Sequence, residues 1–336
     1  MRYVKNIKSY DIDLGLPESK RWDKVIRADL KVAQKLVKEA QEDLKVDSPL
    51  GSFLGGITSA AVGLAYKAMG GRYQDEIRAW ADALGISSRQ MTSLNCLYEL
   101  SHLSNTVLGC TAGVKWIEGQ GMTHIRTMDW PLKAIGPATR LFHFFEGDRS
   151  FYTVGVTGFV GALSGMVPGG YSVTINWAPP EEMPGRGFGP MFLLREVLET
   201  CDTYQEAVEM LRDTPLSTSV FYVVCGVKKG EGCVIERTRT EAVVRRLGTK
   251  KVLAQANHYQ SSAFKGINEF CPQGDEEEMG LLESSEERQA CMEKHLTKDK
   301  KGNLVLSEEP VLNEDTHQKM IFCPASGAVQ IWASTR

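Results

Sequence analysis

The sequence lacks the features that mark several specialised classes of protein. Its 336 residues carry 39 basic and 42 acidic side chains, so there is no excess of positive charge to bind a nucleic-acid backbone. The eight cysteines include no Cys-x-x-Cys pair, and the six histidines show no metal-ligand spacing such as His-Glu-x-x-His. We therefore predict no nucleic-acid partner, no disulfide scaffold, no metal site and no cofactor.

Signals for export are also missing. The first 24 residues include basic side chains but no apolar stretch of the kind found in secretory signals. None of the eight asparagines begins an Asn-x-Ser/Thr acceptor for glycosylation. We expect the protein to be cytoplasmic rather than lysosomal or secreted.

Long apolar runs are scarce. Residues 48–66 form an uncharged run of 19 residues, but four glycines and several hydroxyls dilute its apolar character. The run is typical of a buried or surface-docked helix. Peripheral contact with a membrane and a membrane span are the alternatives.

Hydrophobic periodicity divides the chain into a helical first third and a strand-rich remainder. Helical spacing predicts a helix over 20–46 and two more over 73–107, the second opened by Ser87 or Ser88. At Cys110 the pattern changes to strands. The first two, 111–118 and 122–128, form a hairpin around the glycines of 119–121.

The rest of the chain alternates groups of strands with helices. Further strands are expected at 141–146, 151–156, 159–167, 170–176, 218–227, 232–238, 241–246, 251–256, 319–323 and 328–332. Helices are expected at 191–200, 203–212 and 284–297, the last two opened by the capping boxes Thr203-x-x-Glu206 and Ser284-x-x-Glu287. This order predicts an α+β fold of two antiparallel sheets covered by helices.

Cys110 stands at the junction between these two parts, directly after Gly109. A turn on Gly119-Gln120 would place Cys110 opposite Asp129, and Gly113 opposite Arg126. A thiol, a carboxylate and a guanidinium would then share one small patch, provided that a bulge or the strand end turns one of the charged side chains inward. On residue types alone, a buried structural cysteine and a nucleophile are equally consistent with this position.

Four motifs in this order resemble the N-terminal-nucleophile (Ntn) cysteine amidohydrolases of the choloylglycine hydrolase superfamily. The similarity is greatest to the group formed by acid ceramidase and N-acylethanolamine acid amidase, and it extends over nearly the whole chain. The motifs are YDIDLGLPESKRW (10–22), Cys110-Thr111 with Arg126 and Asp129 sixteen and nineteen residues on, QANHYQ (255–260) and SSEERQ (284–289).

The resemblance implies a four-layer αββα sandwich, with 1–109 as a helical propeptide or small subunit and 110–336 as the catalytic domain. In this family the precursor cuts itself before the cysteine, and we expect the two fragments to stay associated. The new α-amine, with a pKa of ~7.7–8.0, then serves as base for the cysteine thiol. Gly109 suits the cleaved side, because a residue without a Cβ tolerates the strained backbone that the attack requires.

The resemblance also implies roles for five further residues. Arg126 and Asp129 match the pair that holds the new amine and the thiol, with the guanidinium favouring the thiolate. Asn257 and Asn176 match asparagines that help to receive the oxyanion, and Arg288 matches a late arginine of the family. Without the family, either asparagine would be read as an ordinary turn or strand-end residue.

The implied activity is hydrolysis of a linear N-acyl amide, with a fatty acyl group, through a Cys110 thioester. One alternative passes the acyl group to an amine, as the related penicillin-pathway acyltransferases do, and another is a non-catalytic lipid-binding relative. Trp177 stands where the most similar group carries a glutamate, so we expect simple fatty-acyl amides to be preferred over ceramide. Large apolar residues would suit an acyl chain, with core packing as the alternative reading: Trp130, Phe142, Phe144, Phe145, Phe159, Met166, Trp177, Met183, Phe188 and Met191.

Overall fold

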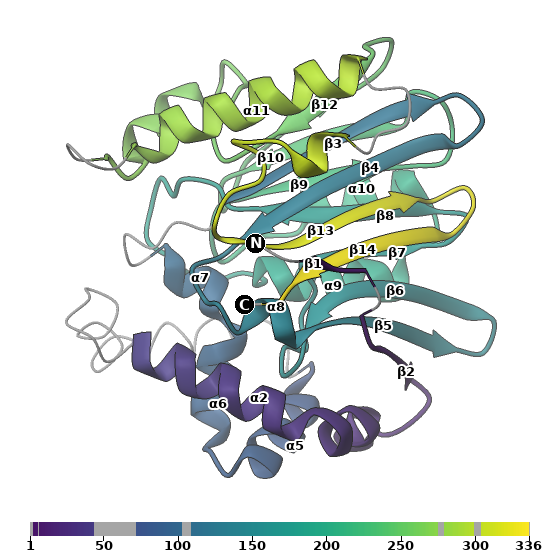
Figure 1. The fold of residues 1–336 in the computed structure, drawn as a ribbon, viewed down its shortest axis with the longest axis vertical. Coiled ribbons are helices and arrows are strands. Elements are labelled where there is room, and N and C mark those ends of the chain that lie inside the picture. The colour runs from purple at the N-terminus through teal and green to yellow at the C-terminus, as the bar shows by residue number, and fades with distance from the viewer. Residues whose placement is uncertain are drawn as a thin grey trace.

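Two β-sheets that face each other form the centre of the molecule (Figure 1). The computed structural model describes residues 3–5, 7–43, 72–102, 109–274, 279–298 and 304–335. The predicted helix at 48–66, with its possible membrane contact, lies outside these described residues. Among the described helices, none is both long and apolar enough to cross a membrane.

The first sheet has six strands in the order β1-β14-β13-β4-β3-β12. Their bounds are Tyr3–Val4 (β1), Ala328–Ser334 (β14), Thr316–Cys323 (β13), Gly121–Asp129 (β4), Cys110–Ile117 (β3) and Val252–Gln255 (β12). All neighbours in this sheet pair antiparallel.

The second sheet has eight strands in the order β11-β10-β9-β8-β7-β6-β5-β2. Their bounds are Ala242–Arg246 (β11), Gly232–Arg237 (β10), Val220–Cys225 (β9), Tyr171–Asn176 (β8), Ser164–Val167 (β7), Arg149–Val156 (β6), Thr139–Glu146 (β5) and Ser9–Asp13 (β2). Pairing is antiparallel except between β2 and β5, which run parallel.

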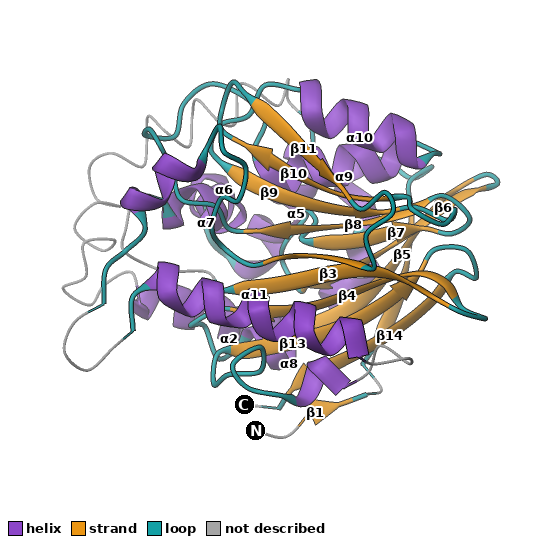
Figure 2. Ribbon diagram, turned by 90° about the horizontal axis from the view of Figure 1, so that it is seen from above, coloured by secondary structure: helices purple, strands orange, loops and turns teal. Residues whose placement is uncertain are grey.

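Helices cover both outer faces of this sandwich (Figure 2). Met292 and Leu296 of α11 (Leu281–Lys298) pack on Ile125 and Ile321 of the six-stranded sheet. On the eight-stranded sheet lie α9 (Pro190–Thr200) and α10 (Tyr204–Asp213). The predicted αββα class is confirmed.

Of the remaining helices, α1, α2 and α5 to α7 lie before β3, and α8, η1 and η2 lie in connections between later elements. They are α1 (Glu18–Arg21), α2 (Asp23–Asp43), α5 (Gln74–Leu84), α6 (Ser88–Asn95), α7 (Leu97–Ser101), α8 (Ile135–Ala138) and the 3-10 helices η1 (Lys265–Phe270) and η2 (Leu304–Ser307). As predicted, Ser87 caps α6, and Thr203 with Glu206 forms the capping box of α10.

The inner faces of the two sheets meet in a layer of apolar side chains. Ala112 and Val114 of β3 pack in one buried cluster with Phe221 and Val223 of β9. Because strand side chains alternate, the even-numbered residues of β3 point into the sandwich and the odd-numbered ones toward α11. Cys110, at the start of β3, belongs to the inward-facing set.

The described residues before Cys110 contribute strands to both sheets. β1 pairs with β14 at one edge, and β2 pairs with β5 at another. The buried Asp29 of α2 accepts from Arg140 at 2.6 Å, and Glu76 of α5 contacts the buried Arg195 of α9. The expectation of a mainly helical segment therefore missed two short strands. β1 has only two residues, and the polar-apolar alternation of β2 (SYDID) was overlooked because it is short.

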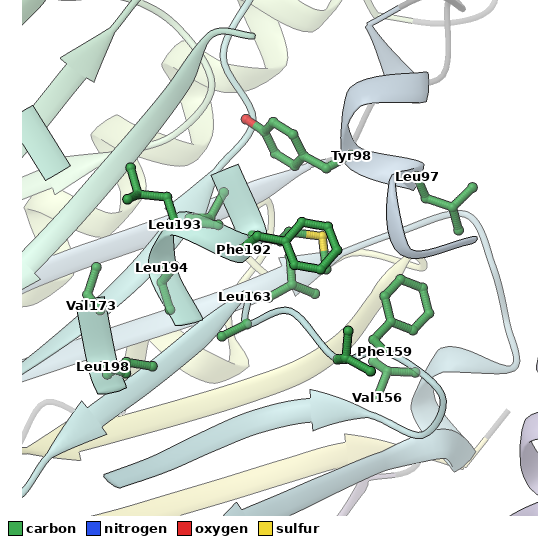
Figure 3. Close-up of a cluster of buried hydrophobic side chains, with 14 of the residues drawn as sticks. Leu97, Tyr98, Val156, Phe159, Leu163, Val173, Phe192, Leu193, Leu194 and Leu198 are labelled. Atoms are coloured by element: carbon green, nitrogen blue, oxygen red, sulfur yellow. The ribbon is translucent and has the colours of Figure 1, made fainter. Parts of the chain in front are cut away.

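The helix that precedes the Gly109-Cys110 junction is also part of the core. Figure 3 shows Leu97 and Tyr98 of α7 beside Phe192 of α9 and Phe159, which follows β6. All four side chains are buried in one cluster. Helix α7 is thus held in the core by these contacts.

Several predicted helix boundaries are wrong: the helix expected over 20–46 forms α1 and α2, the one opened by Ser87 divides into α6 and α7, and the start of the last helix is misplaced. Helix α11 begins at Leu281 rather than at Ser284. The backbone N–H of Ser284 already donates to the Gly280 carbonyl, so Ser284 lies inside the first turn and the predicted capping box with Glu287 does not form. Ser285 and Arg288 of the predicted motif are buried, as are Met292 and Leu296, which pack on the sheet.

Candidate active site

The predicted hairpin of β3 and β4 is present, but its register differs by one residue. Cys110 pairs with Met128 and Ala112 pairs with Arg126, because a three-residue loop, 118–120, replaces the expected two-residue turn. Gly119 in this loop has a φ of 80°, which favours glycine. The shift places the side chains of Cys110 and Arg126 on the same inward face, where they can meet.

Cys110 is buried and is held at three atoms. Its Sγ accepts a hydrogen bond from Nη2 of Arg126 at 3.3 Å, and its backbone N–H donates to Oδ1 of Asn257 at 3.0 Å. Its carbonyl accepts from Nη1 of Arg288 at 2.8 Å and from Nδ2 of Asn176 at 3.3 Å. The structure thus joins five of the six predicted site residues in direct contact.

Arg126 reaches the thiol from the centre of the sandwich. Its Nη1 donates to the Leu163 carbonyl at 2.6 Å and to the Ser164 hydroxyl, and its Nη2 also donates to the Ile175 carbonyl at 2.5 Å. The acceptors of these bonds lie in β7, in β8 and in the loop that precedes β7. They fix a buried positive charge that would stabilise negative charge on the sulfur.

Asp129, the sixth predicted residue, lies on the outer side of the hairpin end. Its backbone N–H donates to the Gly109 carbonyl at 2.8 Å, and its carboxylate accepts from Asn313 at 2.9 Å and from Thr316 at 2.7 Å. A pairing irregularity lies opposite it, between Thr316 and Gln318 of β13. The expected irregularity therefore occurs in the neighbouring strand rather than in β4.

Gly109 leaves no room for a side chain. A Cβ added to it would lie 2.9 Å from Oδ2 of Asp129 and 3.0 Å from its Cβ. The residue before the cysteine must therefore be glycine for the carboxylate to pack against it. The same packing holds the Gly109 carbonyl against the Asp129 N–H.

The two asparagines contact Cys110 in different ways. Asn257 presents its carbonyl oxygen, which accepts from Cys110 and, at 2.8 Å, from Arg288, while its Nδ2 donates to the Trp177 carbonyl at 2.8 Å. Asn176 presents its Nδ2, which also donates to the Gln255 and Ala256 carbonyls at 2.9 and 3.1 Å. Both amides thus bind the backbone around Cys110, and their roles toward an oxyanion stay predictions.

Arg288 approaches the nucleophile from α11. Besides the Cys110 carbonyl, its Nη1 contacts the Thr111 hydroxyl at 3.0 Å. Burial lowers the pKa of Arg288, while the nearby Asp129 carboxylate acts in the opposite direction. Two guanidinium groups therefore flank one residue, Arg126 at its sulfur and Arg288 at its carbonyl.

Several residues that shape the site were not found from the sequence. Ser285 and Asn313 each contact a predicted site residue, as do Ser164 and Thr316. Single Ser, Thr and Asn residues are common at turns and helix ends, so their types carry little signal. Ser285 lies within the SSEERQ motif and could have been proposed from it.

Most of the apolar residues suggested for an acyl chain lie in the core. Phe142 and Phe144 pack against Trp22 beneath the N-terminal helices. The Trp177 indole is buried, donates to the Ser101 hydroxyl at 3.1 Å and stacks on His102 with ring centroids 5.1 Å apart. Trp130 follows Asp129 in the chain, and its ring centroid lies 6.4 Å from that of Phe159. Both side chains belong to the same core cluster as Cys110.

All eight cysteines are free thiols. Within the described parts of the chain, no three His, Cys, Asp or Glu side chains gather so that they could hold a metal ion. The chemistry available at Cys110 is therefore that of a buried thiol, two guanidinium groups, amide groups and one nearby carboxylate.

A four-layer αββα sandwich with a cysteine opening one inner strand is the fold of the Ntn hydrolases. Residues 116–323 match the family described as acyl-coenzyme A:6-aminopenicillanic acid acyl-transferase, and the chain belongs to this family. The predicted relationship to the choloylglycine hydrolase superfamily is confirmed. The matched region begins after Cys110. It contains the other five predicted site residues, which are Arg126, Asp129, Asn176, Asn257 and Arg288.

Named relatives are distant. Acid ceramidase of Rattus norvegicus is 26% identical over 258 residues, which cover 70% of this chain and 64% of that protein. N-acylethanolamine-hydrolyzing acid amidase of Caenorhabditis elegans is 28% identical over 254 residues, covering 70% and 68%. A solved structure of the Caenorhabditis elegans amidase shares the fold, with a TM-score of 0.52 and 24% identity over 67% of this chain and all of that one.

Proposed function

We propose that this protein is a self-cleaving cysteine amidohydrolase that acts on linear N-acyl amides with a fatty acyl group. One observation carries the proposal. Cys110 opens an inner strand with its thiol on Arg126, its nitrogen on Asn257 and its carbonyl on Arg288. The backbone groups of a buried structural cysteine need partners too, but strand neighbours can supply them. At Cys110 polar side chains bind the thiol, the N–H and the carbonyl, which suits a nucleophile that must also supply its own base.

Self-cleavage is the first proposed step. The Cys110 sulfur attacks the Gly109 carbonyl carbon, the C–N bond to the Cys110 nitrogen breaks, and that nitrogen takes up the thiol proton. Water then hydrolyses the thioester, leaving a carboxylate on Gly109 and a free amine on Cys110. The Asp129 N–H, 2.8 Å from the Gly109 oxygen, is positioned to stabilise negative charge that develops there.

Turnover uses the same sulfur with the new amine as its base. The amine takes the thiol proton, the sulfur attacks the acyl carbon of the substrate, and the proton passes to the departing amine. Water hydrolyses the resulting thioester to a carboxylate and restores the thiol. Asn257, which binds the Cys110 nitrogen before cleavage, would then orient the amine.

The substrate class rests on the relatives and on the surroundings of the site. Acid ceramidase and N-acylethanolamine-hydrolyzing acid amidase are named for amide-linked lipids. Buried apolar side chains, among them Trp130 and Phe159, continue from the end of β4 and would suit an acyl chain. The leaving amine stays open.

Acyl transfer is the second candidate. The matched family is described as an acyl-transferase, and a thioester can react with an amine as well as with water. Adding a primary amine to a turnover assay separates the two. Transfer gives a new amide, and hydrolysis gives only the free acid.

The proposal is tested by incubating a long-chain N-acyl amide with the wild-type protein and with Cys110→Ala, and following release of the free acid. We expect turnover by the wild type only. Equal release by the two proteins would refute the assignment of Cys110. Binding of the lipid by the intact single chain without any turnover would instead support a lipid-binding relative.

A further inference from the structure

Three polar side chains of α11 face the loop that carries Asn257. Arg288 and Gln289 follow Ser285 by three and four residues, so both lie one turn along from Ser285 on the same side of the helix. Arg288 binds Oδ1 of Asn257, and Gln289 accepts from the Ala256 N–H at 3.4 Å. Ser285 lies on the same side of α11 as these two residues. The family resemblance assigned it no role.

Ser285 is fully buried and its hydroxyl joins two consecutive residues of that loop. The backbone N–H of Asn257 donates to its Oγ at 2.6 Å, and Nδ1 of His258 lies 2.7 Å from the same Oγ. Burial lowers the pKa of His258 to about 4, so the imidazole is neutral near neutrality. The hydroxyl therefore accepts from the Asn257 N–H and shares a second hydrogen bond with Nδ1 of the neutral His258, and the two bonds together fix its orientation.

The Asn257 side chain is held at its other end as well. Its Nδ2 donates to the Trp177 carbonyl, and its Oδ1 binds both Arg288 and the Cys110 nitrogen. With its backbone fixed by Ser285 and its amide fixed by Trp177, this residue has one position in which Oδ1 meets the nucleophile. Removing the serine hydroxyl would take away one of the hydrogen bonds that hold Asn257, while every side chain that touches Cys110 keeps its chemical identity.

We propose that Ser285 is a positioning residue for the reaction at Cys110, acting through Asn257. The inference rests on the proposed function, because it assigns Asn257 to the amine that self-cleavage creates. Ser285 itself touches neither Cys110 nor, by this account, the substrate. Its loss should therefore slow chemistry and leave substrate binding almost unchanged.

The test compares Ser285→Ala with wild type in self-cleavage and in turnover of a long-chain N-acyl amide. Rates are expressed per Cys110 labelled by a thiol reagent, so that a loss of folded protein is not counted. The label is measured on the peptide that contains Cys110, because the other seven cysteines are free thiols as well. A small misplacement of a reacting group costs up to about a hundredfold, so we expect kcat to fall by about tenfold to a hundredfold with KM within about twofold. Ser285→Thr, which keeps the hydroxyl, should recover most of the rate.

Two further variants make the result specific. Thr297→Ala removes a hydroxyl from the far end of the same helix, where it donates to the Glu293 carbonyl, and should behave as wild type. If Ser285→Ala does not fold, Ser285→Cys keeps the volume with a much weaker hydrogen-bonding group and carries the same expectation.

The outcomes separate this inference from the proposed function. A wild type that neither cuts itself nor turns over amide refutes the proposed function. A wild type that does both, with Ser285→Ala equal to it per titrated cysteine, refutes only the role of Ser285. A rise in KM with unchanged kcat would also overturn it, because that pattern marks lost binding rather than lost positioning.

Discussion

Glu99 gives the protein a pH-dependent stability that can be calculated from its position. This residue of α7 is buried, and Oε1 accepts from the Ser217 hydroxyl at 3.4 Å. Among the described residues, Oε2 has no hydrogen-bond partner. Burial raises the pKa of Glu99 from 4.5 to about 7, with the Ser217 hydroxyl acting in the opposite direction.

The sign follows from which state binds the proton more tightly. The folded chain holds the Glu99 proton up to about pH 7, whereas the unfolded chain releases it near 4.5. The stability contributed by the neutral carboxyl is full below the lower pKa and is lost as the pH rises through the upper one. Between pH 5 and pH 8 the loss is about 2.5 kcal/mol.

The perturbation is Glu99→Gln, which stays neutral at every pH. We expect the free energy of unfolding of the variant, relative to its parent, to rise by about 2.5 kcal/mol between pH 5 and pH 8. Burial lowers the pKa of His102 and His258 to about 4. These histidines favour the folded state as the pH rises, but parent and variant share this effect, so it cancels in the difference.

The assay is urea unfolding followed by tryptophan fluorescence at both pH values. Both proteins carry Cys110→Ala, so that each remains one chain. Glu283→Gln, which removes an exposed carboxyl from α11, is the matched control and should show no such pH dependence. A change of less than about 1 kcal/mol in Glu99→Gln would refute the burial argument.

Four more expectations follow from the site. Gly109→Ala should slow self-cleavage by about tenfold or more, because its Cβ would meet the Asp129 carboxylate at 2.9 Å; normal cutting on a denaturing gel would contradict this. Arg126→Ala and Asp129→Asn should impair self-cleavage and turnover together, and a folded variant that loses only one of them would separate the two steps. Asn257→Ala should lower kcat by ~10²–10³ in a folded protein, and a near-normal rate would remove Asn257 from the site. Across one amine with short to long acyl chains, rates should rise with chain length, whereas rates independent of length would place the acyl pocket elsewhere.

The fold could be predicted because its signals are local and repeated. Strand and helix periods change at Cys110, and the strand opens there. The hairpin register could not be predicted, since glycines at 119 and 121 permit either a two-residue or a three-residue loop. This one-residue difference in loop length decides whether Arg126 faces the thiol. The contact between them was therefore seen only in the structure.

The sequence predicted which residues form the site better than it predicted how their atoms contact one another. Motifs identified Asn257 and Arg288, but the atoms they present to Cys110 depend on how β12 and α11 pack on the hairpin. Ser285 and Thr316 reach Asn257 and Asp129 through hydrogen bonds between residues far apart in the sequence, which no local pattern records. The cytoplasmic location and any membrane contact of 48–66 stay predictions.

Self-cleavage between Gly109 and Cys110 is the central claim, and the intact mass of the purified protein tests it most directly. After incubation between pH 4 and pH 8, the wild type should give fragments of about 12 and about 25 kDa, in proportion to 109 and 227 of the 336 residues of the 37.2 kDa chain. The larger fragment should begin at Cys110, and Cys110→Ala should stay whole. A wild type that hydrolyses amides as one uncut chain, or an alanine variant cut at the same bond, would contradict the account.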